Sequence, residues 1–162
     1  MVKEIQLTRG KVALINDEDY EYLNQWKWFA HTNQGYCYAW GHIKIDGQRK
    51  NVRMHRFLLN TPVGMVTDHI NGDGLDNRRS NIRICTIAEN THNQRKQKRL
   101  TTSRFKGVSW HPVKGKWQAY ISVNKKQNPL GLFDSEIDAA KTYDEAAKKL
   151  HGEFACLNFV GV

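Results

Sequence analysis

Asp68 and His69 form an adjacent pair whose side chains could carry out hydrolytic chemistry. A neutral imidazole takes a proton from water near pH 7, so His69 can serve as a general base. The Asp68 carboxylate offers a hard oxygen of the kind that Mg²⁺ binds. A base beside a divalent cation suits phosphodiester hydrolysis, because the cation neutralises the charge that develops on phosphorus and on the leaving 3′ oxygen.

Two asparagines extend this pair. The side-chain oxygen of Asn90 can be a second hard ligand, while water and phosphate oxygens complete the coordination that Mg²⁺ prefers. Asn81 lies just before a predicted strand, where its side chain can bridge backbone groups of the loop and so hold His69 in place. His92 is an alternative ligand, but two residues along a helix turn it about 200° away from Asn90.

The elements around these residues predict a ββα unit. Residues 65–70 (MVTDHI) and 82–85 (IRIC) have strand patterns, and the loop between them is rich in turn-forming residues. Thr86 and Glu89 match a capping box, which predicts a helix from Ile87 to about Lys98. Asn90 would then lie in the first turn of that helix.

Residues 1–60 predict mostly short strands. Asp46-Gly47 is a hairpin signal between two strand patterns. Residues 17–23 (DEDYEYL) predict a short helix with Asn16 or Asp17 as its N-cap. Several aromatic side chains could stack on bases, but core packing is their commoner role in a small sheet. They are Trp26, Trp28, Tyr36, Tyr38 and Trp40.

Residues 104–159 predict three strands followed by one helix. The strand patterns are FKGVSWH, KWQAYISV and PLGLF. The helix is predicted over 135–151, with Gly152 as its C′ residue. Apolar residues form one stripe along this helix. They are Ala139, Ala140, Tyr143, Ala146, Ala147 and Leu150.

The expected fold class is α+β, in three parts. A β-rich N-terminal segment (1–52) precedes a ββα unit (53–98). A C-terminal domain (99–162) then consists of a three-stranded antiparallel sheet packed on one helix. Sequence reasoning leaves open whether residues 1–52 pack on the ββα unit or contact a ligand themselves.

The charge distribution indicates a nucleic-acid partner. The chain has 25 Lys and Arg against 16 Asp and Glu, a net charge of +9. Residues 90–133 contain ten basic side chains and no acidic one, whereas acidic residues return in the final helix. Phosphates should therefore meet the sheet and the basic linker at 95–106. Strand 116–123 alternates, so that Lys116, Gln118, Tyr120 and Ser122 form a polar row suited to base edges in the major groove.

Other classes of protein are disfavoured. The three cysteines, Cys37, Cys85 and Cys156, lie far apart, which argues against a disulfide framework and a cysteine zinc site. No apolar run approaches the roughly 18 residues of a membrane span. The N-terminus has no apolar segment typical of secretion. We expect a soluble intracellular protein with no membrane partner.

The central segment resembles the HNH homing endonucleases of phages over about residues 53–95. The residues that carry the resemblance are Asp68-His69-Ile-Asn-Gly-Asp-Gly-Leu-Asp-Asn-Arg-Arg-Ser-Asn81-Ile-Arg-Ile and Asn90-x-x-Asn93-Gln94, with Met54-His55-Arg56-Phe57 upstream. The resemblance implies a ββα-metal fold, with His69 as general base, Asn81 as the structural asparagine, and Asp68 and Asn90 as ligands of one Mg²⁺ or Mn²⁺. The last motif position is Asn90 rather than His, as in nicking members of the family.

Residues 104–159 resemble the APETALA-type/ethylene-response-factor DNA-binding domain. Its pattern appears in Phe105-Lys-Gly-Val108, Gly115-Lys-Trp-Gln-Ala-Tyr-Ile121, Leu130-Gly-Leu-Phe-Asp134, Tyr143-Asp-Glu-Ala-Ala147 and Leu157-Asn-Phe159. By position, the DNA-reading residues are Lys106, Ser109, His111, Lys116, Tyr120 and Ser122. Several are arginines in the plant family, so bidentate guanine contacts are lost and the plant target is not expected. Linker residues expected on phosphates are Arg95, Lys96, Lys98, Arg99 and Arg104.

These patterns predict a site-specific, homing-type DNA endonuclease that nicks or cleaves double-stranded DNA. One active site per chain favours a monomer, in the cytoplasm of a phage-infected or bacterial host. The alternative is a non-catalytic, sequence-specific DNA-binding regulator in which the HNH segment is a degenerate scaffold.

Overall fold

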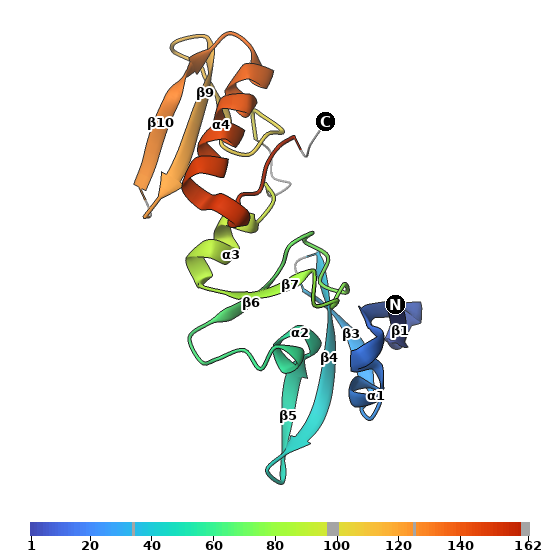
Figure 1. The fold of residues 1–162 in the computed structure, drawn as a ribbon. Coiled ribbons are helices and arrows are strands. Elements are labelled where there is room, and N and C mark those ends of the chain that lie inside the picture. The colour runs from blue at the N-terminus through green and yellow to red at the C-terminus, as the bar shows by residue number, and fades with distance from the viewer. Residues whose placement is uncertain (34, 97–100, 125, 160–162) are drawn as a thin grey trace. The chain divides into compact units, whose positions relative to one another are not determined.

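The computed structural model describes residues 1–33, 35–96, 101–124 and 126–159. They form two compact units, Met1–Asn90 and Thr91–Val162 (Figure 1). Lys98 and Arg99, which we expected on phosphates, lie outside the described residues. No helix in these ranges is long and apolar enough to cross a membrane.

The first unit combines small antiparallel sheets with short helices. A two-stranded sheet pairs β1 and β2, a three-stranded sheet has the order β3-β4-β5, and a further two-stranded sheet pairs β6 and β7. In chain order the elements are β1 (Val2–Gln6), η1 (Thr8–Gly10), β2 (Val12–Asn16), η2 (Asp17–Asp19), α1 (Tyr20–Leu23), β3 (Trp28–Asn33), β4 (Tyr36–Ile45), β5 (Gln48–Arg53), α2 (Met54–Leu58), β6 (Val66–His69) and β7 (Ile82–Cys85).

One hydrophobic core holds this unit together. Ile15 and Leu23 from the N-terminal segment pack in the same cluster as Met54 and Ile82, which flank the predicted site segment. Burying such side chains contributes about 1.5–3 kcal/mol each. Residues 1–52 therefore pack on the segment that carries Asp68 and His69.

Local sequence signals of this unit were mostly confirmed. Asp46 and Gly47 have φ values of 51° and 78° between the paired residues Ile45 and Gln48, as a two-residue hairpin turn requires. The expected cap of the short helix was wrong. Neither Asn16 nor Asp17 caps it with a side chain, because the Asn16 oxygen accepts the backbone N–H of Arg79 instead.

A capping box begins helix α3 (Ile87–Asn93) as predicted. Thr86 Oγ1 accepts from the Glu89 N–H at 3.2 Å, and the Glu89 carboxylate accepts from the Thr86 N–H at 2.7 Å. The helix ends at Asn93, earlier than the predicted end near Lys98. The Lys106 ammonium caps this end by donating to the carbonyls of His92 and Gln94, at 2.6 Å each.

The second unit has the predicted sheet-and-helix architecture. Its sheet has the antiparallel order β10-β9-β8, and helix α4 covers one face (Figure 1). The elements are β8 (Val108–His111), β9 (Lys116–Val123), β10 (Lys126–Phe133), α4 (Glu136–His151) and η3 (Gly152–Phe154).

Small residues let α4 lie close to the sheet. Ala139, Ala140 and Ala147 are fully buried against β9, whereas Leu150 is 51% exposed, so the predicted stripe ends one turn earlier than expected. Gly107 marks the closest approach. Its φ is +71°, and a Cβ there would lie 1.9 Å from the Tyr143 ring.

Candidate active site and nucleic-acid interface

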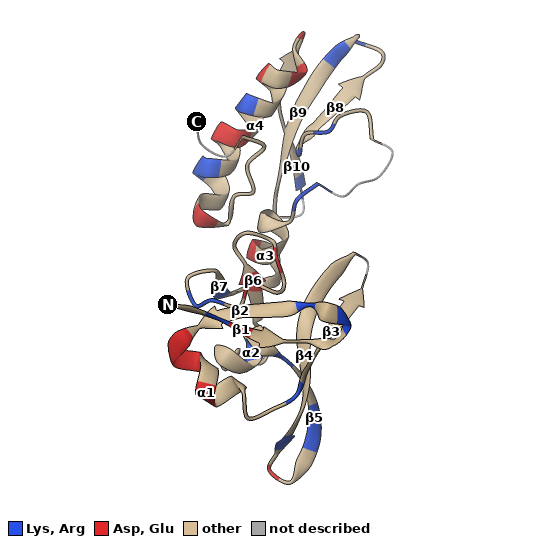
Figure 2. Ribbon diagram, turned by 90° about the vertical axis from the view of Figure 1, so that its right-hand side faces the viewer, with Lys and Arg blue, Asp and Glu red and all other residues tan. Residues whose placement is uncertain are grey.

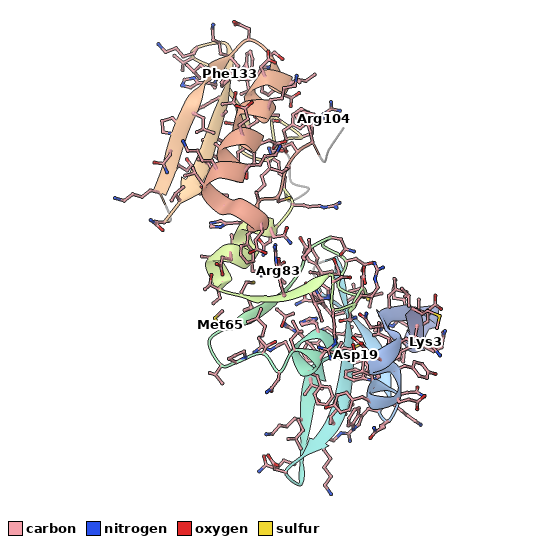
Figure 3. All side chains as sticks on the ribbon, viewed as in Figure 1. Lys3, Asp19, Met65, Arg83, Arg104 and Phe133 are labelled. Carbon is pink, nitrogen blue, oxygen red and sulfur yellow. The ribbon has the colours of Figure 1, made fainter. Side chains whose placement is uncertain are left out.

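Asp68 and His69 end strand β6 and are both buried, at 5% and 6% exposure. Antiparallel pairing with β7 places Arg83 opposite Asp68. The Arg83 guanidinium donates to Asp68 Oδ2 from Nε at 3.0 Å and from Nη2 at 2.9 Å (Arg83 is labelled in Figure 3). The buried carboxylate is thus neutralised by a cation from the neighbouring strand, as a buried charge requires.

Burial favours the neutral form of the His69 ring. Desolvation lowers the pKa of His69, although a hydrogen bond with Asn77 and the carboxylates of Asp68, Asp73 and Asp76 act in the opposite direction. A ring whose pKa lies below its usual value is in the base form at neutral pH. That is the form a general base needs.

A second histidine lies against the first. The rings of His55 and His69 meet edge to face with centroids 4.7 Å apart, and the Tyr38 ring lies 5.6 Å and 5.9 Å from them. Burial lowers the pKa of His55 to about 2, with further lowering from His69 and Arg53, so this ring is neutral at physiological pH. Sequence reasoning placed His55 in the helix before the site but gave it no role.

Asn81 ties together both ends of the loop between β6 and β7. It is 7% exposed, and its Oδ1 accepts from the Asn71 N–H at 3.0 Å. Its Nδ2 donates to Asn71 Oδ1 at 3.0 Å and to the Asp76 carbonyl at 2.8 Å. These bonds give Asn81 the geometry of a positioning residue for the loop that follows His69.

We expect Asn81→Leu to lower the free energy of unfolding by about 2–4 kcal/mol, because each buried polar group left unpaired costs about 1–3 kcal/mol. Urea unfolding measures the change. Asn24→Leu, at an exposed position, is the control and should change stability little. An Asn81→Leu protein as stable as wild type would show that the loop does not depend on this network.

The N-terminal segment clamps the same loop from outside. The Leu14 N–H donates to the Leu75 carbonyl at 2.9 Å, and the Asn77 N–H donates back to Leu14 at 2.7 Å. Arg79 makes a bidentate contact with the buried Asp19, at 2.6 Å from Nη2 and 3.0 Å from Nε (Asp19 is labelled in Figure 3). Bidentate Arg–carboxylate pairs add geometric specificity, so residues 1–52 help fix the loop.

Asn90 lies in the first turn of α3, where its N–H donates to the Thr86 carbonyl at 3.0 Å. Its backbone also reaches the Cys85 thiol, and the Asp68 charge acts on the same thiol. Burial, more than that charge, raises the pKa of Cys85 to about 11, so the thiol is not a nucleophile at neutral pH. These contacts place the backbone of Asn90 beside the buried Cys85 side chain.

Asp68 and Asn90 also suit a particular kind of cation. In the described part of the chain, no three His, Cys, Asp or Glu side chains gather closely enough to hold a metal, which argues against a cage made of those residues alone. A carboxylate and an amide oxygen are hard ligands, and Mg²⁺ is usually bound by few protein oxygens with water and phosphate supplying the rest. The residues present fit such an ion.

In the second unit, β9 alternates as predicted. Ala119 and Ile121 are buried toward α4, at 0% and 1% exposure. The opposite face carries the predicted row, with Ser109 paired to Gln118 and His111 to Lys116. Its other predicted DNA-reading members are Tyr120, which is half-buried, and Ser122, which is exposed.

Two lysines that we expected on DNA make contacts inside the second unit instead. Lys96 donates to the carbonyls of Phe105 and Val108, at 2.7 and 3.1 Å. Lys106 caps α3 as described above, and burial lowers the pKa of both lysines. Arg95 and Arg104 are exposed, so they are better placed than these lysines to reach phosphate.

Comparison with known proteins places each unit in a family. Residues 60–92 match the HNH endonuclease family. An uncharacterised HNH endonuclease of Acanthamoeba polyphaga mimivirus is 26% identical over 156 residues, covering 93% of this chain and 76% of that protein. Protein 3.8 of Escherichia phage T7 is 32% identical over 94 residues, covering 58% of this chain and 76% of that protein.

Residues 103–153 match the AP2 domain family. APETALA2-like protein 2 of Oryza sativa is 43% identical over 60 residues, which is 36% of this chain. The alignment spans 14% of the length of that plant protein. No solved structure matches the chain significantly.

Proposed function

Because this chain belongs to the HNH endonucleases and carries a C-terminal AP2 domain, we propose that it is a site-specific DNA endonuclease of the homing type. Residues 53–98 form the ββα-metal nuclease unit, and residues 99–162 choose the DNA. The observation that carries the proposal is the buried pair of Asp68 and His69 at the end of β6, with Asn81 tying the loop that follows.

His69 takes the proton from the attacking water in this mechanism. Its ring is neutral, and it is held between Tyr38 and His55 on one side and the Asn81-tied loop on the other. A base held by packing needs no reorganisation at the moment of proton transfer. Asp68 and Asn90 would hold one Mg²⁺ or Mn²⁺, which neutralises charge on the phosphate and on the leaving 3′ oxygen.

Arg83 keeps the Asp68 carboxylate paired while no cation is bound. An unpaired buried carboxylate would be costly, and the guanidinium lies 2.9 Å from it. Asp68 would hold a divalent cation through the same carboxylate, of which Arg83 contacts Oδ2. The site is therefore stable before it binds metal.

The AP2-type domain supplies the choice of sequence. A base and a metal ligand aimed at phosphate have no sequence preference of their own. The outer row of β8 and β9, including Ser109, His111, Lys116, Tyr120 and Ser122, is suited to base edges, and Arg95 and Arg104 to phosphates. With one nuclease unit per chain, a monomer would nick one strand.

Plasmid relaxation tests the activity. Purified protein should convert supercoiled plasmid or phage DNA to the nicked form in Mg²⁺ or Mn²⁺ but not in EDTA. A protein that binds DNA with a defined sequence yet nicks no substrate in either metal would instead be the non-catalytic regulator.

The second unit alone should bind DNA. We expect a fragment of residues 91–162 to bind duplex DNA with an affinity that falls steeply between 50 and 200 mM salt, because each neutralised phosphate adds about −0.9 to the slope of log K against log salt. Fluorescence anisotropy with a labelled duplex measures the slope. A folded fragment that binds independently of salt, or does not bind, would contradict the assignment of this unit.

A further inference from the structure

The sheet β3-β4-β5 has one face that the proposed nuclease function does not use. Ala39, Gly41 and Ile43 of β4 point to the core, so the residues between them point outward. This outer face is formed by Tyr38, Trp40, His42 and Lys44 of β4 with Arg49 and Arg53 of β5. Trp28 is in the core, at 4% exposure, but Tyr38 and Trp40 are half-buried on this face.

The outer face carries cationic side chains that form no ion pairs with carboxylates of the described residues. Lys44 is paired directly with Arg49 across the two strands, and both are exposed. Like charges directly opposite one another destabilise a sheet. Among the described residues, no carboxylate forms an ion pair with Lys44, Arg49 or Arg53. The arrangement is unfavourable by itself and becomes favourable when an anion lies across the two strands.

Four acidic residues of this unit lie together on a different segment. Asp17, Glu18 and Asp19 form η2 and Glu21 follows in α1, whereas β5 carries Lys and Arg (Figure 2). Charge is thus partly separated within this unit, with Asp46 of the β4–β5 turn as the exposed acidic residue nearest to the Lys44–Arg49 pair. A polyanion that approaches it is attracted to the outer face and repelled by η2 and α1.

Aromatic rings hold Arg53 and His42 of this face in place. The Arg53 guanidinium lies over the Trp40 ring at 5.0 Å and over the Tyr38 ring at 5.7 Å. His42 packs on Phe29 at 5.0 Å, and its Nδ1 is hydrogen-bonded to the Asn51 side chain. Side chains restrained in this way lose less entropy when they bind, so the part of the face formed by Arg53 and His42 is organised before any ligand arrives.

The outer face leads directly to the proposed general base. Tyr38 contacts Arg53 on one side and the His69 ring, at 5.9 Å, on the other. From Tyr38 to Lys44 the strand rises by six residue steps, or about 20 Å at the usual 3.3 Å per residue. The rise of about 3.4 Å per nucleotide is measured along the DNA axis, and successive phosphates of one strand lie farther apart because the strand winds round that axis. The three cationic side chains of the face, Lys44, Arg49 and Arg53, therefore match about three phosphates.

We propose that the outer face binds the backbone phosphates of double-stranded DNA immediately beside the phosphate that is cut. The position beside the cut rests on the proposed function of His69, but binding to DNA does not. The N-terminal segment then has two roles: its core side fixes the loop after His69, and its outer face holds the substrate against the site.

The test is a charge-neutralising pair on the full-length chain. In Lys44→Gln/Arg49→Gln, the slope of log K against log salt for duplex binding should become shallower by about 2, because two phosphate contacts are lost at about 0.9 each. The matched control is Lys148→Gln/Lys149→Gln, which removes the same charge from exposed positions on α4. The control should keep the wild-type slope.

Hydroxyl-radical footprinting locates the contact. Wild type should protect about three nucleotides on one side of the nick, one for each cationic side chain of the face, and the Lys44→Gln/Arg49→Gln protein should lose that protection while keeping the footprint of the AP2 domain. Unchanged slope and footprint in this protein, or equal loss in the control, would overturn the proposal. If wild type proves unable to nick but the slope still changes, the nuclease function fails and the DNA-binding face stands.

Discussion

Replacing His69 by Ala should reduce the nicking rate by about 10²–10⁴-fold, the range that general-base catalysis contributes. The ring is buried, neutral and packed against His55, so its loss removes the base that the fold holds at the end of β6. DNA affinity should change little, since the outer face and the AP2 domain are untouched. Plasmid relaxation gives the rate, and anisotropy gives the affinity of the same preparation.

His92→Gln is the control for this prediction. His92 is the alternative metal ligand, but its ring stacks on that of His151 in the second unit, with ring centroids 3.7 Å apart. We expect its loss to leave nicking within a few-fold of wild type. If His69→Ala nicks as fast as wild type, the base assignment is wrong. If His92→Gln abolishes nicking while His69→Ala does not, the site has been assigned to the wrong histidine.

Replacing Asp68 by Asn should both inactivate and destabilise the protein. Removal of one partner from a buried ion pair typically costs about 3–5 kcal/mol, and here it leaves the Arg83 guanidinium, 13% exposed, without its carboxylate oxygen. The substitution also removes the anionic metal ligand. Urea unfolding measures the first effect, and metal-dependent nicking measures the second.

Arg83→Gln separates these two effects. It removes the two hydrogen bonds that the guanidinium donates to Asp68 Oδ2, so the protein should melt at a lower temperature than wild type. Mg²⁺ or Mn²⁺ should then raise its melting temperature more than that of wild type, because a ligand that binds the native state stabilises it by mass action. This readout does not require catalysis.

Arg79→Gln is the matched control, because it removes a guanidinium from another buried carboxylate, Asp19. Divalent cations should restore its stability less than that of Arg83→Gln, even though the Glu18 carboxylate also contacts Arg79, at 3.7 Å. If Mg²⁺ and Mn²⁺ leave the melting temperature of Arg83→Gln unchanged, Asp68 does not bind the metal. Equal restoration of both variants would indicate a nonspecific effect of ionic strength.

Local signals in the sequence predicted most of the elements because each has a local cause. The hairpin at Asp46-Gly47 requires two positive φ angles, and the capping box at Thr86 satisfies N–H groups within its own helix. The alternation of β9 likewise follows from one buried face. Each of these can be judged from a few neighbouring residues.

Contacts between distant segments could not be predicted in the same way. His55 and Tyr38 reach the His69 ring from a helix and a strand that precede it by 14 and 31 positions, and neither spacing shows the encounter. Lys96 and Lys106 look like phosphate-binding lysines in a basic run. Their ammonium groups instead donate hydrogen bonds to backbone carbonyls, Lys96 to that of Phe105 and Lys106 to that of His92. The early end of α3 follows from the contact of Lys106 with the last carbonyls of this helix.

The aromatic residues of the N-terminal segment illustrate the limit most clearly. Trp28 and Trp40 have the same residue type in adjacent strands of one sheet, yet Trp28 is in the core and Trp40 is on the outer face below Arg53. The expectation of core packing was therefore right for Trp28, whereas Trp40 is only partly buried. The face each residue takes depends on strand register, which is set by pairing with other strands.

Sequencing the DNA ends that the wild-type chain produces tests the central claim most directly. The protein is incubated in Mg²⁺ with DNA of the genome that encodes it, and His69→Ala serves as the blank. We predict breaks in one strand at a small number of positions that share a sequence, absent in the blank. Breaks scattered without a shared sequence would contradict site choice by the AP2 domain, and no breaks beyond the blank in Mg²⁺ or Mn²⁺ would contradict the nuclease itself.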